Sequence, residues 1–280
     1  MKIIYLLGRG RSGSTLISHV LGSQKDVLNV GELKNFWEYH CREDKMGRKC
    51  SDGLNLDNHP FWTKVRNELK SKINNEFPNL KVKNNDEFQN NNSAMFNAIN
   101  KISGDEIIVD ASKKFERLKR LLKVNKNIYT IHVVRDPRAY AFSIMKHNKR
   151  ALTKNKKPQS VWLKVVTWSI YNLYVKLYLK ITGVRHITMT YEDFVDQPKN
   201  KLNQVFSFIG KNDSSVNLSF SELQPVFGGN VWFLESKQSE IKKDELYKKI
   251  LTKKQWIIYT ILSFPVLLFY RYPLKRYNND

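Results

Sequence analysis

The sequence predicts an α/β fold in which a central parallel sheet is flanked by helices. Four short apolar runs, each followed by a helical pattern, support this prediction; they span residues 3–7, 106–110, 128–135 and 185–191. Runs that are continuously apolar are typical of parallel strands buried on both faces, and alternating strands and helices are typical of a doubly wound sheet. Ligands of such folds bind where the strands end. The residues that directly follow each run are therefore the candidates for function.

The length of 280 residues fits one domain that spans residues 1–280 and carries an insert at about 32–104. Within this insert the pattern predicts a helix near Phe61–Ile73. The Asn-rich part, around Asn84 and Asn90–Asn92, is expected to be a mobile loop. Such an insert could cap a binding site over the strand ends. A surface insertion without function is an equally good interpretation of the Asn-rich part.

A long helical pattern spans residues 158–181, and its apolar residues recur at helical spacing. This spacing favours packing against the core over a binding stripe. The stripe comprises Trp162, Val165, Val166, Ser169, Leu173 and Leu177.

Two terminal segments bear on the relation to membranes. The run Ile3–Leu7 is too short for a signal peptide and is assigned to the first strand. The segment Trp256–Tyr270 is shorter than a membrane span and contains Pro265, so we expect a buried helix that ends or kinks there. Peripheral membrane contact, helped by Arg271, Lys275 and Arg276, is the less favoured interpretation. Cytoplasm is the default location on this evidence.

The chain is strongly basic, with a formal net charge of +22 and a pI of about 9.8. This charge indicates an anionic partner, which could be a nucleotide, an anionic glycan, nucleic acid or an anionic membrane. A solvated Lys-rich surface is the alternative. The two cysteines, Cys41 and Cys50, could form one disulfide or remain free thiols. Even with His40 and His59 nearby, they do not predict a metal site.

The first candidate site is the loop Gly8–Thr15, which follows a predicted strand and leads into a helical pattern. Such a loop can hold a phosphate with backbone N–H groups and the helix dipole. Its glycine spacing is that of the ATP-binding P-loop, but Ser14 stands where that motif has lysine. Arg9 and Arg11 are the cations of the loop. The pattern therefore indicates a nucleotide other than ATP.

The second candidate site is the segment Val133–Ser143. A strand is expected to end at Arg135, with Asp136 as the N-cap and Pro137 as the first residue of a helix. Ser143 would then point back toward the strand end, near a phosphate that Arg135 holds. By itself the segment could be an ordinary helix cap beside a surface arginine. Together with the first loop, it fits one ligand that carries two phosphate groups.

These two motifs, with the later Tyr191–Pro198 segment, resemble the sulfotransferase family that uses 3′-phosphoadenosine 5′-phosphosulfate (PAPS), and most of all its bacterial or carbohydrate and tyrosylprotein branches. The resemblance implies a P-loop NTPase-like sulfotransferase fold, PAPS as donor, adenosine 3′,5′-bisphosphate as product, and no metal. It places Arg135 and Ser143 at the 3′-phosphate. The residues that it places at the 5′-phosphosulfate are Arg11, Ser12, Gly13, Ser14 and Thr15.

The resemblance also implies catalytic roles. The Gly-Glu pair at residues 31 and 32 matches the segment whose glutamate is taken as the base, so Glu32 would deprotonate the acceptor hydroxyl. Lys113, in a segment similar to the Asp-x-Ser-Lys of bacterial members, would lie near the sulfuryl group with Arg11 and stabilise the charge that builds on the leaving oxygen. A solvated carboxylate and a basic first helical turn are the competing interpretations. His19 and His132 are expected to be structural.

A late Gly-Asn pair, Gly229 and Asn230, stands where the family has a loop near the 3′-phosphate. The basic residue that should follow is absent, unless Lys237 replaces it. The ending Phe269–Tyr272 also looks like the family's usual ending.

The sequence thus favours a sulfotransferase whose acceptor is a hydroxyl-bearing carbohydrate, such as an anionic glycan, or a small metabolite. Two alternatives stay open. A P-loop small-molecule kinase would need a metal-binding carboxylate, for which Asp110 is the candidate. A non-enzymatic nucleic-acid binder would explain the charge, but the chain shows no known binding motif, so no nucleic acid is expected.

Overall fold

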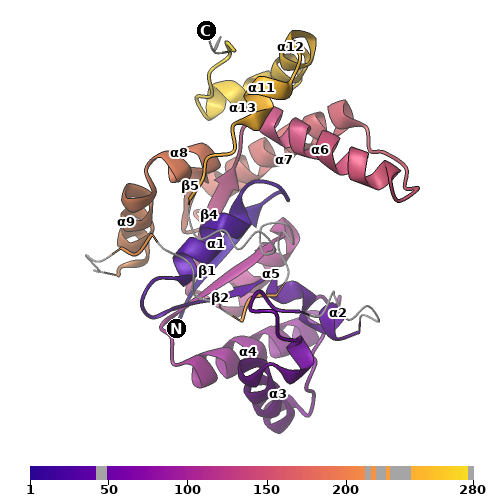
Figure 1. Cartoon of the computed structure of the whole chain (residues 1–280). Coiled ribbons are helices and arrows are strands. Elements are labelled where there is room, and N and C mark those ends of the chain that lie inside the picture. The colour runs from indigo at the N-terminus through magenta and orange to yellow at the C-terminus, as the bar shows by residue number, and fades with distance from the viewer. Residues whose placement is uncertain (42–48, 212–215, 219–224, 228–240, 277–280) are drawn as a thin grey trace.

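The centre of the molecule is a five-stranded parallel sheet flanked by helices, which confirms the predicted fold class (Figure 1). The computed structural model describes residues 1–41, 49–211, 216–218, 225–227 and 241–276. The strands are β1 (Lys2–Gly8), β2 (Val27–Gly31), β3 (Ile107–Lys113), β4 (Ile128–Val134) and β5 (His186–Thr190). Their order across the sheet is β2-β3-β1-β4-β5, and every pairing is parallel. All carboxyl ends therefore meet at one edge of the sheet.

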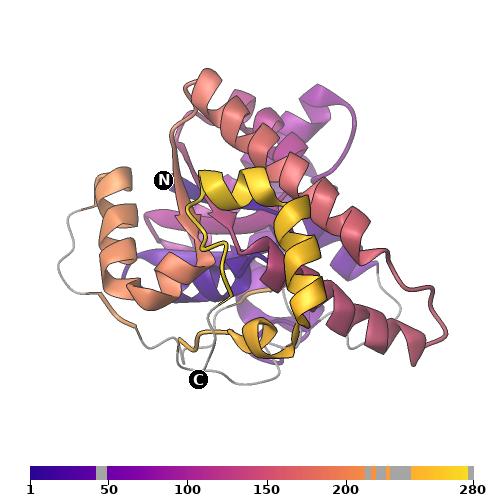
Figure 2. The ribbon, with the colours of Figure 1, turned by 90° about the horizontal axis from the view of Figure 1, so that it is seen from above.

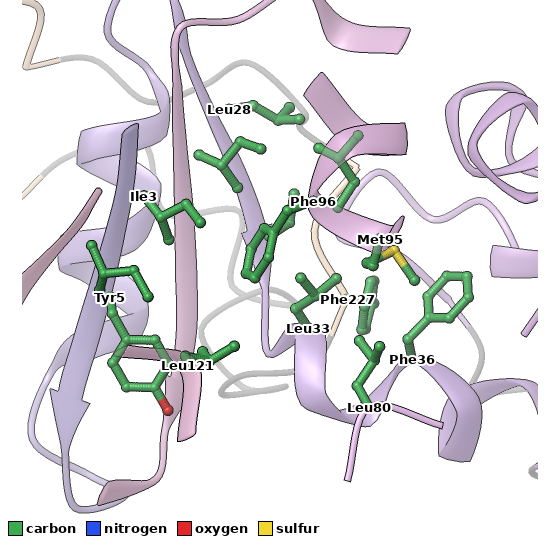
Figure 3. Packing of buried hydrophobic residues seen from close by; sticks show 14 of the residues in the cluster. Ile3, Tyr5, Leu28, Leu33, Phe36, Leu80, Met95, Phe96, Leu121 and Phe227 are labelled. Atoms are coloured by element: carbon green, nitrogen blue, oxygen red, sulfur yellow. The ribbon is translucent and has the colours of Figure 1, made fainter. Parts of the chain in front are cut away.

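Both faces of this sheet are buried, which explains the continuous apolar runs. Along β1, Ile3, Tyr5 and Leu7 enter one apolar cluster, while Ile4 and Leu6 enter another on the opposite face. Figure 3 shows Ile3 and Tyr5 in the first cluster. The helices whose apolar residues join the first cluster include α3 (Pro60–Ile73), α4 (Asn85–Ser103) and α5 (Phe115–Val124). Those that join the second are α1 (Ser14–Gly22), α8 (Tyr191–Asp196) and α9 (Pro198–Ile209).

The sheet has one more strand than the four predicted. The additional strand, β2, is an edge strand of five residues that contains Asn29 and ends in Gly31, so its sequence carries little strand signal. A second difference concerns β3, which continues to Lys113. Asp110, the last residue of the predicted run, therefore lies inside this strand and is fully buried.

The insert contains the predicted helix, α3, but the Asn-rich segment is not a loop. It forms the 19-residue helix α4, for which the Asn84 side chain accepts hydrogen bonds from the amides of Asp86 and Glu87. Asn92 is buried and donates to the carbonyl of Phe88, one turn earlier. The asparagines therefore cap and cross-link the helix, and its apolar face packs on the sheet. The insert also holds three short elements: η1 (Leu33–Asn35), α2 (Phe36–His40) and η3 (Leu56–Asn58).

A separate layer of helices covers the β4–β5 side of the sheet. Its members are α6 (Pro137–Leu152), α7 (Val161–Ile181), α11 (Leu246–Ile250), α12 (Lys253–Leu262) and α13 (Phe264–Phe269). α6 begins as predicted, since the Asp136 side chain accepts from the amide of Arg138. The break at Ser263, with Pro265 in the first turn of α13, confirms the predicted kink. Among the described residues, no helix is both long and apolar enough to cross a bilayer.

The predicted core stripe of α7 is wrong in part. Val165 and Ser169 are buried, but Trp162 and Leu177 have 59% and 57% of their surface exposed. The buried face instead includes Trp168, Asn172, Val175 and Leu179. The stripe was misplaced because α7 is apolar on nearly all sides, so periodicity alone does not select its inner face.

Candidate active site at the carboxyl ends of the strands

The loop after β1 presents an open helix N-terminus. α1 starts at Ser14, and its N-cap residue Gly13 has no side chain to bond the first amides. Ser12 is almost fully buried, and its hydroxyl has no hydrogen-bond partner within the described part of the chain. Free amides at a helix start and an unsatisfied buried hydroxyl are features of an anion site.

Gly13 is required because the ring of Tyr191 lies against it. A Cβ at Gly13 would come within 2.3 Å of Cδ2 of Tyr191, and the backbone there has a φ of 86°. The guanidinium of Arg135 lies over the same tyrosine ring, 4.4 Å from its centre. Tyr191 thus joins the first loop to the second motif, a role that the sequence did not reveal.

The two predicted phosphate motifs meet through a hydrogen bond. Nη1 of Arg11 donates to Oγ of Ser143 over 2.9 Å, although the two residues are 132 positions apart. Arg11 has a φ of 72°, a left-handed conformation that a residue other than glycine seldom adopts. The fold therefore brings the predicted 5′-loop to within one hydrogen bond of the predicted 3′-site.

Arg135 forms an ion pair with Asp244, a residue that the sequence did not indicate. Its Nη2 donates to Oδ2 of Asp244 over 3.0 Å, while its Nε is buried and has no partner within the described residues. The Arg135 side chain is 10% exposed and that of Asp244 is 44% exposed. Asp244 comes from a segment more than 100 residues away, so no local pattern could have indicated the pair.

The second part of the site is centred on Glu32, which follows β2. Gly31 adopts a φ of 69°, and a Cβ there would lie 2.2 Å from the carbonyl oxygen of Phe227. The amide of Glu32 donates to that same carbonyl over 3.0 Å. Only glycine allows this close backbone approach, and this explains the Gly-Glu pair.

The Glu32 carboxylate is held by two lysines. Nζ of Lys113 donates to Oε1 over 2.8 Å, and Nζ of Lys34 donates to Oε2 over 2.5 Å. Nδ2 of Asn35 also donates to Oε2, over 3.1 Å. Lys113 is the last residue of β3 and has a φ of 65°, so its contact with Glu32 comes from the sheet end and not from a surface helix. Lys34 and Asn35, two and three residues after Glu32, were missed.

The lysines decide the ionisation of Glu32. Burial alone would raise the pKa of this carboxyl, but the charges of Lys113 and Lys34 and their hydrogen bonds outweigh burial and bring the pKa to about 2. Burial lowers the pKa of Lys34, although its pairing with Glu32 partly offsets this effect. Glu32 is therefore ionised at neutral pH and able to accept a proton once a lysine moves away.

Tyr171 of α7 connects the two parts of the site. Its hydroxyl donates to the carbonyl of Lys113 over 3.5 Å, and the guanidinium of Arg9 lies 4.8 Å from its ring centre. The predicted residues therefore form one region at the carboxyl edge of the sheet, with Tyr171 in the wall between the glycine loop and the Glu32 cluster.

Other candidates have structural surroundings. Asp110, the possible metal ligand of a kinase, accepts from the amide of Ser112 and faces Arg117 at 3.4 Å. Burial lowers the pKa of His19 to about 4 and that of His132 to about 3, so both are neutral at physiological pH. Nε2 of His132 lies 3.1 Å from the amide oxygen of Asn172 inside the core.

Cys41 and Cys50 are free thiols. Cys50, Asp52 and His59 form a group of potential metal ligands within 4.8 Å of one another. However, Nδ1 of His59 accepts from the amide of Phe61, and Nε2 lies 2.7 Å from Asp52. This arrangement leaves the Nε2 proton on the imidazole, and we assign the group to hydrogen bonding within the insert. The Gly229–Asn230 pair and Lys237 lie outside the described residues.

A buried acid, Glu192, lies behind Arg135. Its carboxyl accepts from the amide of Asp136 over 3.0 Å and from the hydroxyl of Tyr272 over 2.8 Å. Burial, and then the negative charge of Asp136, raise the pKa of Glu192 to about 7. This network ties the C-terminal segment to the end of β4.

The raised pKa predicts a pH-dependent stability. The folded protein binds the Glu192 proton more tightly than the unfolded chain, so ionisation of this group destabilises the fold as pH rises from about 4.5 to about 7. Glu192→Gln removes the charge; its amide oxygen accepts from the Asp136 amide, and its amide nitrogen donates to the Tyr272 hydroxyl in place of the bond that Glu192 accepted. We expect this variant to raise the free energy of unfolding by about 2–3 kcal/mol at pH 8 and by much less at pH 5. Urea unfolding at the two pH values measures this. An equal change in the free energy of unfolding at both pH values would contradict the raised pKa of Glu192.

The sulfotransferase family model matches residues 4–214, about three quarters of the sequence. No curated protein matches the sequence. Among solved structures, the chain is similar to the sulfotransferase domain of the Synechococcus PCC 7002 olefin synthase, with 17% identity, a TM-score of 0.60, and coverage of 98% of this chain and 95% of that one.

Two further solved structures are similar. One is the sulfotransferase domain from the curacin biosynthetic pathway, with 17% identity, a TM-score of 0.57, and coverage of 94% of this chain and 97% of that one. The other is the sulfotransferase STF9 from Mycobacterium avium, with 11% identity, a TM-score of 0.53, and coverage of 96% and 76% respectively. At these identities the likeness is one of fold.

Proposed function

The chain belongs to the sulfotransferase family, and on this premise we propose that it moves a sulfuryl group from PAPS to the hydroxyl of a carbohydrate or small-metabolite acceptor. The observation that carries the proposal is the hydrogen bond between Arg11 and Ser143. It joins two anion-binding motifs into one site for a ligand with two phosphate groups. A site for ATP would need neither the second motif nor the replacement of the P-loop lysine by Ser14.

The residues present fit such a donor. The open start of α1 and the unpartnered hydroxyl of Ser12 suit the 5′-phosphosulfate, with Arg11, Gly13, Ser14 and Thr15 around them. For the 3′-phosphate, Arg135 and Ser143 supply a guanidinium and a hydroxyl, and the unpartnered Nε of Arg135 leaves a donor available.

In the proposed reaction the donor supplies the sulfuryl group and leaves as adenosine 3′,5′-bisphosphate. Glu32 accepts the proton of the acceptor hydroxyl at Oε1, the atom that Lys113 contacts in the resting site. Lys113 turns from Glu32 toward the sulfuryl group and, with Arg11, stabilises the negative charge on the leaving oxygen. The movement of Lys113 also raises the pKa of Glu32, so the base becomes stronger when the donor is in place.

Asp244 is expected to compete with the nucleotide for Arg135. Its carboxylate is bonded to the guanidinium that would hold the 3′-phosphate, and the two negative groups would repel each other. Asp244→Asn should therefore tighten the binding of adenosine 3′,5′-bisphosphate by about three- to tenfold, as measured by calorimetry. Asp193→Asn, at an exposed carboxylate on α8, is the matched control and should leave affinity unchanged. Weaker binding by Asp244→Asn would show instead that Asp244 orients Arg135 for the ligand.

The direct test of the proposed function is transfer of radiolabelled sulfate from PAPS to a panel of carbohydrate, aliphatic-alcohol and peptide-tyrosine acceptors. Thermal-shift measurements with adenosine 3′,5′-bisphosphate, Mg·ATP and an oligonucleotide accompany it, because each ligand would stabilise only its own class of protein. Stabilisation by Mg·ATP with no response to the bisphosphate would favour a kinase and overturn the proposal.

A further inference from the structure

The positive charge of the chain is concentrated in two segments that contain no carboxylate. Residues 137–191 hold eleven Lys and Arg and no Asp or Glu, and residues 246–276 hold seven Lys and Arg and again no acidic residue. These eighteen basic residues account for most of the formal net charge of +22. The rest of the sequence is close to neutral.

The two segments pack together in space. α12 contacts α6 and α7, α11 contacts α6, and α13 contacts α7. Their shared core includes Val134, Trp168 and Trp256. Figure 1 shows these helices at the upper end of the molecule, and Figure 2 shows α12 and α13, in yellow, beside α7 on the face seen from above. One end of the protein therefore carries both acid-free segments.

This end also exposes large apolar side chains of α7. Opposite its buried face, α7 presents an outward stripe at spacings of three, four and seven residues, with exposures between 48% and 73%. The stripe consists of Leu163, Ile170, Tyr174, Leu177 and Ile181. A helix that is apolar on its solvent side as well as its core side marks an interaction surface.

The C-terminal helices add a second apolar group. Ile257 and Ile261 of α12, and Phe264, Leu268 and Phe269 of α13, are between 44% and 68% exposed. Exposed lysines stand at the start of α12, and Arg271 follows α13. Apolar side chains among cations are typical of surfaces that lie on a membrane.

We propose that this basic apolar face, formed by the outward side chains of α7, α12 and α13, binds the surface of an anionic lipid bilayer. The apolar side chains enter the boundary between headgroups and acyl chains, and the surrounding Lys and Arg side chains contact the lipid phosphates or carboxylates. The inference is independent of the proposed reaction, because none of these outward residues belongs to the candidate active site.

The charge and the exposed apolar side chains of this face favour an anionic bilayer over a second copy of the chain or a nucleic acid. In a symmetric dimer through this face, the Lys and Arg side chains of the two copies would be brought together, and their repulsion opposes association. Nucleic acid would satisfy the lysines but would leave the aliphatic side chains of α12 and α13 exposed to water. An anionic bilayer, unlike either of these partners, offers both negative charge and an apolar phase to the same face.

Vesicle co-sedimentation of the full chain tests the proposal. We expect binding to vesicles of phosphatidylcholine with 30% phosphatidylserine that is at least tenfold tighter than to phosphatidylcholine alone, and that weakens as salt rises. Equal binding to both compositions, or binding to neither, would overturn the proposal.

Two pairs of variants assign the binding to this face. Ile261→Gln with Leu268→Gln, and separately Lys253→Gln with Lys254→Gln, should each weaken vesicle binding about tenfold. The matched controls are Leu54→Gln, an exposed leucine in the insert, and Lys64→Gln with Lys72→Gln on α3, and these should bind as the parent does. If the lysine pair matters and the apolar pair does not, the face adsorbs polyanions such as nucleic acid and the proposal fails.

Sedimentation velocity without lipid completes the test. We expect a monomer in both the parent and the apolar pair. A parent dimer that the apolar pair dissociates would identify the face as a contact between two copies and overturn the lipid assignment. Circular dichroism and thermal unfolding of each variant show whether its fold is intact.

Discussion

Glu32→Gln is expected to lower the turnover number by 10²- to 10⁴-fold while adenosine 3′,5′-bisphosphate binds as it does to the parent. The amide cannot accept the acceptor's proton, and general-base catalysis contributes a factor of this size. Because Glu32 contacts Lys113 and Lys34 and not the nucleotide loop, the variant should slow the sulfuryl-transfer step and leave nucleotide binding unchanged. Single-turnover sulfate transfer and calorimetry with the bisphosphate measure the two quantities.

Two further variants make this prediction specific. Glu38→Gln removes an exposed carboxylate six residues later, one paired with Lys81, and should leave turnover unchanged. Lys34→Met removes one of the two charges that hold the pKa of Glu32 near 2, so this pKa should rise and an acidic limb should appear at higher pH in the pH profile of kcat/KM. If Glu32→Gln retains full turnover, Glu32 is not the base.

Arg135→Ala should weaken the binding of adenosine 3′,5′-bisphosphate about a hundredfold, because a charge-assisted contact with the 3′-phosphate is lost. AMP, which has no 3′-phosphate, should bind the variant and the parent equally. This comparison separates a lost contact from a damaged fold, since a damaged fold would weaken both ligands. Calorimetry with the two nucleotides gives the ratio of affinities directly.

Arg135 is largely buried between Asp244 and the Tyr191 ring, so its removal also leaves a gap. Arg135→Lys keeps a charge and should recover part of the affinity, whereas Arg185→Ala, at an exposed arginine before β5, is the neutral control. Unchanged discrimination between the bisphosphate and AMP in Arg135→Ala would rule out the 3′-phosphate assignment.

Local sequence was sufficient to predict the site motifs that directly follow a strand. Three short segments show this: the glycine loop after β1, the Asp136 cap of α6 and the Gly-Glu pair after β2. In each, the residue types of the segment itself indicate the backbone conformation. Four of the five strands were also predicted. Of these, β1, β3 and β4 are buried almost throughout and carry a largely apolar run, whereas the first three residues of β5 are only half-buried. The strand that escaped prediction, β2, is a short edge strand interrupted by an asparagine.

Composition and periodicity failed for two helices, α4 and α7. The asparagines of α4 looked like a loop because their composition is polar, yet Asn84 caps the helix and Asn92 bonds within it. Trp162 and Leu177 of α7 were predicted to be core but are exposed, because an apolar residue has the same periodicity whether a neighbouring helix covers it or not.

The sequence by itself determined the family, the parallel sheet and the residues of both phosphate motifs, since these depend on backbone geometry that neighbouring residues impose. Only the tertiary structure decided how they combine. The Arg11–Ser143 bond, the pairing of Glu32 with Lys113, the placement of Asp244 against Arg135 and the gathering of two acid-free segments at one end all join residues far apart in the chain. Such contacts arise from the packing of whole helices on the sheet, and no short stretch of sequence carries the information that specifies them.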